Sequence, residues 1–152
     1  MKIAVGADHA GFATKEHVKA ALVRAGHEVH DCGTQGEASV DYPDYARLVA
    51  QAVAEGRAER GVLVCGTGIG MSITANKVDG IRAAKCNDPY EARMARAHND
   101  ANVVCVGARV IDASVLDEVV REFIATLFEG GRHARRVEKM MRESPSQDAC
   151  GS

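Results

Sequence analysis

The sequence lacks any continuous apolar stretch of about 18 residues, the length that a membrane-spanning helix requires. It also lacks an excess of either charge, since 19 Lys and Arg oppose 21 Asp and Glu and leave a net charge of −2. No broad positive field is therefore expected for binding nucleic acid or an anionic membrane. The first residues, MKIAVGADHAGF, do not have the apolar core and cleavage site of a secretory signal.

The cysteines form no metal or redox motif. The five of them include neither a C-x-x-C pair nor the Cys/His spacing of a zinc site. Free thiols are typical of a reducing compartment, so the sequence predicts a cytoplasmic protein held together without a disulfide or a structural metal.

Length and composition indicate one globular domain. The chain has 152 residues, of which 46% are hydrophobic and 26% charged, a balance typical of a folded domain. We expect this domain to span residues 1–143. The remaining residues 144–152, SPSQDACGS, have little to pack and are expected to form a frayed tail.

Short apolar runs alternate with helical patterns along the whole chain. The predicted strands are Ile3 to Ala7, Glu28 to Cys32, Gly61 to Cys65, Ile81 to Cys86 and Val103 to Gly107. The predicted helices span about 14–25, 43–55, 69–77, 89–98 and 114–128, the last beginning at Ser114 as cap and ending at Gly130, and a further helical pattern covers 131–142. The alternation predicts an α/β three-layer sandwich, with a Rossmann-like parallel sheet of about five strands, helices on both faces and an added C-terminal helix. Ligands of such sheets bind at the carboxyl ends of the strands.

One segment at a predicted strand end is built for close approach to an anion. Three glycines follow Cys65 within five positions, and a helix is expected to begin behind them. Backbone amides at such a turn favour a phosphate or a developing oxyanion, and they favour a thiolate at the cysteine. The segment fits neither a P-loop nor a dinucleotide fingerprint. A buried structural thiol is the alternative for Cys65, whereas Cys32, Cys86 and Cys105 are expected to be structural.

Other candidate groups can be interpreted in two ways. Asp8 and His9 follow the first strand, where they could transfer protons, or Asp8 could cap the next helix. His98 could act chemically or only stabilise the end of its helix. Arg132 and Arg136 lie one turn apart and could clamp a phosphate or form part of a solvated charged face.

Together these residues resemble one known family over residues 1 to about 143. The matching motifs are Gly6 to Phe12 (GADHAGF), Asp41 to Asp44 (DYPD), Cys65 to Gly70 (CGTGIG), Ala97 to Asn99 (AHN), Gly107 to Arg109 (GAR) and the pair Arg132 and Arg136. They resemble the sugar-phosphate isomerases of the type B ribose-5-phosphate isomerase family, which also contains the galactose-6-phosphate isomerase subunits.

The resemblance implies an aldose–ketose isomerase that interconverts ribose 5-phosphate and ribulose 5-phosphate without metal or cofactor. It implies a homodimer, or a dimer of dimers, whose active sites lie at the subunit interface and combine residues of both subunits. Cys65 then corresponds to the base, Thr67 binds the reacting oxygens, and His98 opens the furanose ring with help from Asp8. The substrate-binding set would be His9, Tyr42, Gly66, Gly68, Ile69, Gly70 and Asn99, and the phosphate-binding set His9, Arg109, Arg132 and Arg136.

Two alternatives remain open at this point. The substrate could be a 6-phosphohexose such as allose or galactose 6-phosphate, if residues 33–42 leave a roomier pocket. The chain could also be a sugar-phosphate sensor without catalysis, which would need the arginines and amides but no thiolate.

Overall fold

The computed structural model describes residues 1–142, so the predicted tail lies outside the described residues. The strands are β1 (Lys2–Ala7), β2 (Glu28–Asp31), β3 (Arg60–Cys65), β4 (Ala83–Lys85) and β5 (Val103–Gly107). The helices are α1 (Phe12–Arg24), α2 (Tyr42–Ala54), α3 (Ile69–Ala75), α4 (Pro89–Asn99), α5 (Ala113–Ala125) and α6 (Arg132–Met141).

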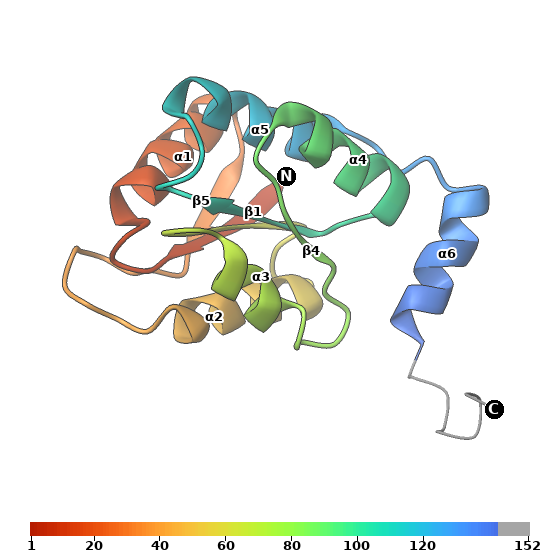
Figure 1. Ribbon diagram of the computed structural model, residues 1–152, viewed down its shortest axis with the longest axis horizontal. Helices are drawn as coiled ribbons and strands as arrows, with labels where there is room; N and C mark the ends of the chain where they lie inside the picture. Colours follow the sequence, from red (N-terminus) through yellow and green to blue (C-terminus); the bar gives the residue numbers. More distant parts are fainter. Residues whose placement is uncertain (143–152) are drawn as a thin grey trace.

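The five strands form one parallel sheet in the order β2-β1-β3-β5-β4. Helices α1, α4 and α5 cover one face, α2 and α3 cover the other, and α6 stands beside the body (Figure 1). The predicted α/β sandwich is therefore confirmed. From β1 the chain crosses to β2 on one side and later to β3 on the other, so a crevice opens between the carboxyl ends of β1 and β3. Ligands of open α/β sheets bind at such a switch point.

The core has two parts because both faces of the sheet are covered. On one face Val18 of α1 and Phe123 of α5 pack against the strands, and on the other Val49 of α2 and Met71 of α3 do so. Each of these four side chains is at most 1% exposed, and full burial of one such side chain stabilises the fold by roughly 1.5–3 kcal/mol. Burial on both faces explains why the central strands are almost continuously apolar.

The ends of α5 differ from the sequence prediction. Asp112, not Ser114, caps the helix, because its carboxylate accepts hydrogen bonds from the amide and the hydroxyl of Ser114. The helix also ends at Ala125 instead of continuing to 128. Thr126 is extended, and the Glu129 amide donates to the Ala97 carbonyl of α4 at 3.0 Å.

The boundaries of four other elements shift slightly. Strands β2 and β4 are shorter than predicted, so Cys32 and Cys86 lie just after strands, whereas Cys105 lies within β5 as expected. Helix α1 begins two residues earlier than expected and α3 ends two residues earlier. Within residues 1–142, no helix combines the length and the hydropathy needed to span a bilayer.

Candidate active site

The thiol of Cys65 lies at the carboxyl end of β3 and faces the glycine loop. Its Sγ accepts a hydrogen bond from the Gly68 amide at 3.1 Å, and the residue is only 4% exposed. Gly68 has a φ of 78°, in the left-handed region, where a side chain would be strained. This conformation turns the amide back toward the sulfur.

The glycine loop is fixed against the end of β5. The amide of Ala108 donates to the Cys65 carbonyl at 2.8 Å, and that of Arg109 donates to the Gly66 carbonyl at 3.0 Å. A Cβ on Gly107 would lie 2.5 Å from the carbonyl carbon of Thr67. The exposed Thr67 is thus held by backbone contacts, and its Oγ1 accepts a hydrogen bond from the Ile69 amide at 3.3 Å. The next amide, that of Gly70, belongs to the first turn of α3, where amides have no partner within the helix.

Asp8 and His9 follow β1 on the other side of the crevice. Asp8 is buried and accepts a hydrogen bond from the Gly11 amide at 3.0 Å, directly before α1, so it supports the helix start as well as lining the crevice. The Nδ1 of His9 lies 3.2 Å from the Val40 amide. Because an amide can only donate, Nδ1 accepts and the ring proton of His9 stands on Nε2. That N–H is available to donate to an anion.

The remaining side chains of this edge line a cavity next to the glycine loop or lie against the loop itself. A cavity of about 500 Å³ is lined by Asp8, His9, Val40, Asp41, Tyr42, Pro43, Asp44 and Arg47. The Tyr42 ring lies over Gly70, where an added Cβ would be 2.5 Å from the ring carbons. The exposed Arg109 guanidinium lies against Gly66. The structure therefore brings together the predicted residues of β1, β3, β5 and the start of α2.

The other four predicted residues lie at the opposite edge of the sheet. Helix α4 runs back against the strands, so His98 and Asn99 at its end lie where strands begin. The Asn102 carbonyl, three residues further on, accepts from the Gly61 amide at the start of β3. Arg132 and Arg136 are on α6 beside the end of α4, on the right in Figure 1, whereas the carboxyl ends of the strands point left. Within one chain, the predicted site is thus divided into two halves.

The larger of the two cavities is not the one beside Cys65. A larger cavity of about 630 Å³ lies at the amino edge, between the end of α6 and residues 76–84. It has Asn99 in its lining but none of the residues that surround Cys65.

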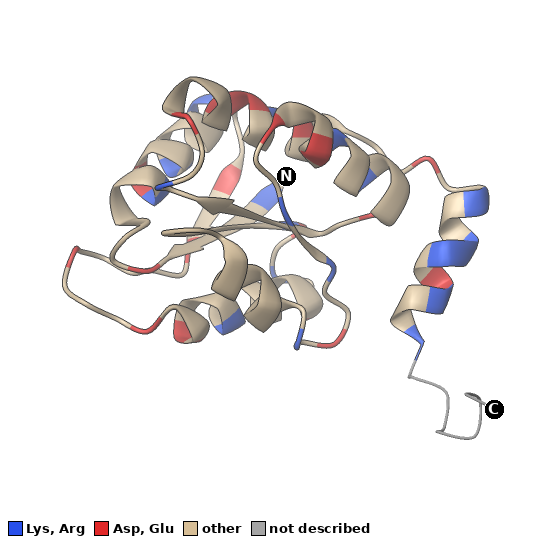
Figure 2. Cartoon of the chain, in the orientation of Figure 1, with Lys and Arg blue, Asp and Glu red and all other residues tan. Residues whose placement is uncertain are grey.

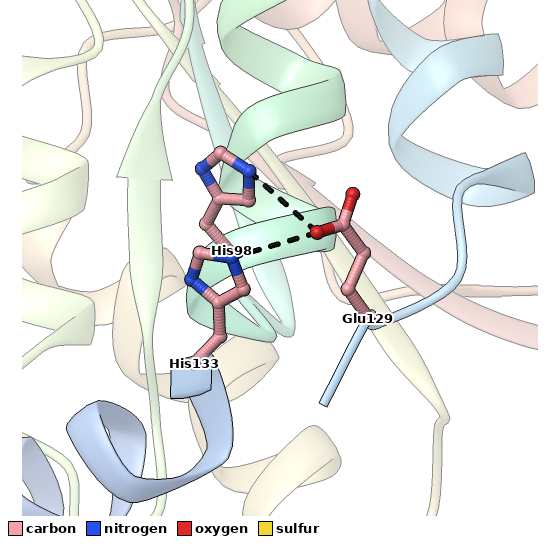
Figure 3. Close-up of side chains that lie close together, drawn as sticks. All are labelled: His98, Glu129 and His133. Carbon is pink, nitrogen blue, oxygen red and sulfur yellow. Dashed lines mark ion pairs between the residues drawn. The ribbon is translucent and has the colours of Figure 1, made fainter. Parts of the chain in front are cut away.

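His98 has two partners that the sequence analysis did not identify. Its ring stacks on that of His133, with centroids 4.2 Å apart and planes 7° apart. One carboxylate oxygen of Glu129 lies 3.9 Å from Nε2 of His98 and 3.5 Å from Nε2 of His133 (Figure 3). Glu129 and His133 are four residues apart, but nothing in that spacing shows that α6 docks on the end of α4.

These three side chains are also residue types that bind metals. One ligand atom from each lies within 4.8 Å of the others. An imidazole, however, binds a metal along the nitrogen lone pair, in the plane of its ring, at about 2.0–2.1 Å for zinc. Two stacked rings with nearly parallel planes cannot both direct their lone pairs to one ion. In this arrangement the cluster fits a stacked imidazole pair better than a metal centre.

Two other thiols are unsuited to proton transfer. Burial raises the pKa of Cys86 to about 12, and it also raises the pKa of Cys105, which lies wholly inside the sheet. Neither has a contact with the glycine loop among the hydrogen bonds of residues 1–142. Their structural interpretation is therefore supported, and Cys65 is the thiol at the ligand-binding edge.

The fold and the site define a class: an α/β protein with a glycine-rich loop behind a thiol at the carboxyl edge of its parallel sheet. A family model described as Ribose/Galactose Isomerase matches residues 3–140. Ribose-5-phosphate isomerase B of Escherichia coli is 49% identical over 137 residues, which are 90% of this chain and 92% of that protein. D-erythrulose-4-phosphate isomerase of Pectobacterium atrosepticum is 44% identical over 142 residues, 92% of this chain and 93% of that one.

A solved structure shows the same similarity. Ribose-5-phosphate isomerase B of Clostridium thermocellum superposes with a TM-score of 0.92 and is 49% identical, and the match covers 93% of this chain and 95% of that one. The chain belongs to the ribose/galactose isomerase family and is a sugar-phosphate isomerase.

Proposed function

We propose that the chain interconverts D-ribose 5-phosphate and D-ribulose 5-phosphate, with Cys65 as the base. The observation that carries the proposal is the hydrogen bond from the Gly68 amide to Cys65 Sγ at 3.1 Å, inside the glycine loop that leads directly into α3. A sensor would need the amides and the arginines but would gain nothing from a thiol held in this way.

The isomerisation needs one proton transfer at carbon. The thiolate of Cys65 takes the proton from C2, and the C–H electrons form the C1–C2 double bond of an enediolate while negative charge moves to O1. Return of the proton to C1 and transfer of the O2 proton to O1 give the ketose. Charge on oxygen appears only during the reaction, so fixed donors such as the loop amides and Thr67 stabilise the transition state selectively.

Most of the free aldose is a closed ring, which must open first. A base removes the proton of the C1 hydroxyl, the C1–O4 bond breaks, and O4 takes up a proton. We assign this step to His98, assisted by Asp8. Since His98 lies at the amino edge and Asp8 at the carboxyl edge of the same chain, the assignment requires His98 of a second copy to reach this crevice.

Phosphate binding follows the same division. His9, through its Nε2–H, and Arg109 lie beside the glycine loop, while Arg132 and Arg136 would come from the second copy together with Asn99. Among the described helices and strands, α6 is the most basic, with four Arg or Lys and one Glu. Figure 2 shows these basic residues as blue bands along the helix. Guanidinium groups suit a phosphate because they donate in pairs. The second copy makes the proposed enzyme a homodimer at least.

Turnover of ribose 5-phosphate by the purified chain, measured in the presence of a chelator, tests this proposal. We expect ribulose 5-phosphate to form, and we expect Cys65→Ala to lower kcat by about 10²- to 10⁴-fold, the usual contribution of a general base. Cys32→Ser, which changes a half-buried thiol outside the site, should leave kcat unchanged. Full activity of Cys65→Ala would disprove its role as base.

A tetrose phosphate is a second candidate substrate. The relative from Pectobacterium atrosepticum, 44% identical, is named a D-erythrulose-4-phosphate isomerase. A shorter sugar fits the same chemistry, because only C1, C2 and the phosphate need to be held. Values of kcat/KM for tetrose, pentose and hexose phosphates would rank the three, and a higher value for erythrulose 4-phosphate would replace ribose 5-phosphate as the substrate.

A further inference from the structure

The imidazole of His98 does not stand alone at the end of α4. His98 is the last residue but one of that helix and is 39% exposed on its side chain, so by itself it would turn freely in solvent. The His133 ring instead covers one of its faces at 4.2 Å. His133 is 6% exposed, which shows that this contact is part of the packed body and not a surface coincidence.

Backbone contacts hold the two partners in place. The Glu129 amide donates to the carbonyl of Ala97, the residue before His98, and the His133 amide donates to the Gly130 carbonyl, both at 3.0 Å. The connector from α5 therefore satisfies a carbonyl at the end of α4 that the helix leaves unpaired. It thereby sets Glu129 and His133 against the His98 ring.

Charge and protonation agree with this geometry. Burial lowers the pKa of His133, and the neighbouring His98 and Arg132 lower it further, so His133 is a neutral ring at neutral pH. A neutral imidazole can stack on the His98 ring without charge repulsion. The same Glu129 oxygen lies 3.9 Å from Nε2 of His98 and 3.5 Å from Nε2 of His133, so one carboxylate faces the same edge of both stacked rings.

We propose that His133 and Glu129 are positioning residues for His98: the stacked ring sets the plane of the His98 imidazole, and the carboxylate faces the Nε2 edge of both rings and holds the pair in place. The inference rests on the proposed role of His98 in ring opening. His133 lies between Arg132 and Arg136 on α6, so the docking of that helix positions the phosphate-binding arginines and the ring-opening imidazole together.

Ring opening can be observed separately from isomerisation, because it exchanges the α and β furanose forms of ribose 5-phosphate. In a Cys65→Ala background, exchange spectroscopy by NMR should show accelerated anomer exchange. Adding His133→Ala should reduce that acceleration on the order of 10- to 100-fold, the effect of a misplacement of about 1 Å. His133→Phe, which keeps a stacked ring, should restore most of it. Glu138→Gln changes an exposed acid of α6 that pairs with Arg142, and it should have no effect.

A second readout needs no substrate. In imidazole ¹⁵N spectra of the unliganded protein, the signals of His98 should differ from those of a freely exchanging histidine, and Glu129→Gln or His133→Ala should move them toward those values. Unchanged His98 signals in both variants would overturn the proposal.

These experiments distinguish a failure of the positioning role from a failure of the proposed isomerase activity. If Cys65→Ala accelerates exchange and the added His133→Ala does so equally, the positioning role is wrong while the isomerase proposal stands. If the wild-type protein does not convert ribose 5-phosphate at all, the proposed function fails, and the ¹⁵N spectra alone decide whether Glu129 and His133 hold the ring.

Discussion

Gly107 is the residue at which the fold and the chemistry meet most closely. It ends β5, and its Cα faces the backbone of Thr67 across the crevice edge. A flexible side chain can move away from an added methyl group, whereas the backbone of a loop that also positions Cys65 cannot do so without changing the site. Close backbone approach thus gives the loop its position, just as the left-handed Gly68 gives it its turn.

We expect Gly107→Ala to inactivate the enzyme more than it destabilises it. The new Cβ would meet three backbone atoms of Thr67 at 2.5, 2.6 and 2.7 Å. Overpacking costs about 1–3 kcal/mol, but displacing the loop by about 1 Å should lower kcat on the order of 100-fold. Steady-state kinetics and thermal unfolding measure the two effects.

Gly36→Ala is the matched control. No atom lies within 4 Å of the Cβ position at Gly36, and its φ is not in the left-handed region. Both kcat and Tm should be unchanged in this variant. Wild-type kcat in Gly107→Ala would show that Thr67 does not need its observed position.

At the scale of elements, a buried charge cluster joins α1 to the end of β2. The side chain of Lys15 is 0% exposed and lies 2.8 Å from Asp31, which also binds Lys19 at 2.8 Å. Burial by itself raises the pKa of Asp31, but hydrogen bonds from Lys15, Lys19 and the Gly33 amide outweigh it and hold the pKa below the ordinary value of 3.8. The cluster therefore sets where the segment leading to Tyr42 leaves the sheet.

Asp31→Asn should lower the free energy of unfolding at pH 7 by about 3 kcal/mol, because it leaves a buried lysine with only the partly exposed Glu16 as partner. A carboxylate with a depressed pKa stabilises the fold above its unfolded pKa and loses that effect as pH falls through its folded pKa. The difference between wild type and variant should therefore shrink in urea unfolding below about pH 4.

Glu55→Gln provides the comparison, since its pair with Arg57 is more than half exposed. Such surface pairs contribute about 0–1 kcal/mol. A pH-independent difference for Asp31→Asn, or an equal loss in both variants, would contradict the assigned role of the cluster.

The helix and strand boundaries also show how much of the fold the sequence alone predicts. The sequence predicts the strands and five of the six described helices within about two residues, because apolar runs and 3.6-residue spacing reflect burial directly. The end of α5 is not predicted correctly, because Leu127 and Phe128 continue the apolar pattern although the helix ends at Ala125. A tertiary contact, the bond from the Glu129 amide to Ala97, decides that boundary, and Leu127 is left 82% exposed.

The site was predictable to a similar extent. Residues that directly follow strands, such as Asp8 and Cys65, could be placed at one edge of the sheet from the alternating pattern. The partners of His98 could not, because Glu129 and His133 reach it only through the docking of α6. Local spacing contains no information about that contact.

At the scale of the whole molecule, the division of the site is the main consequence of the topology. Every helix that returns between parallel strands ends at the amino edge, so His98 and Asn99 cannot share an edge with Cys65 in one chain. Helix α6 lies beside that same end of α4 (Figure 1). A complete set of base, ring-opening group and arginines therefore requires two chains in the proposed reaction.

Complementation between two inactive variants tests this claim most directly. Cys65→Ala and His98→Ala are purified separately, mixed under conditions that exchange subunits, and assayed on ribose 5-phosphate. In a mixed two-fold dimer, one site receives intact Cys65 from one chain and intact His98 from the other, so statistical mixing should restore about a quarter of wild-type activity. If each site were built from a single chain, the mixture would stay as inactive as its components despite demonstrated subunit exchange, and the account would be contradicted.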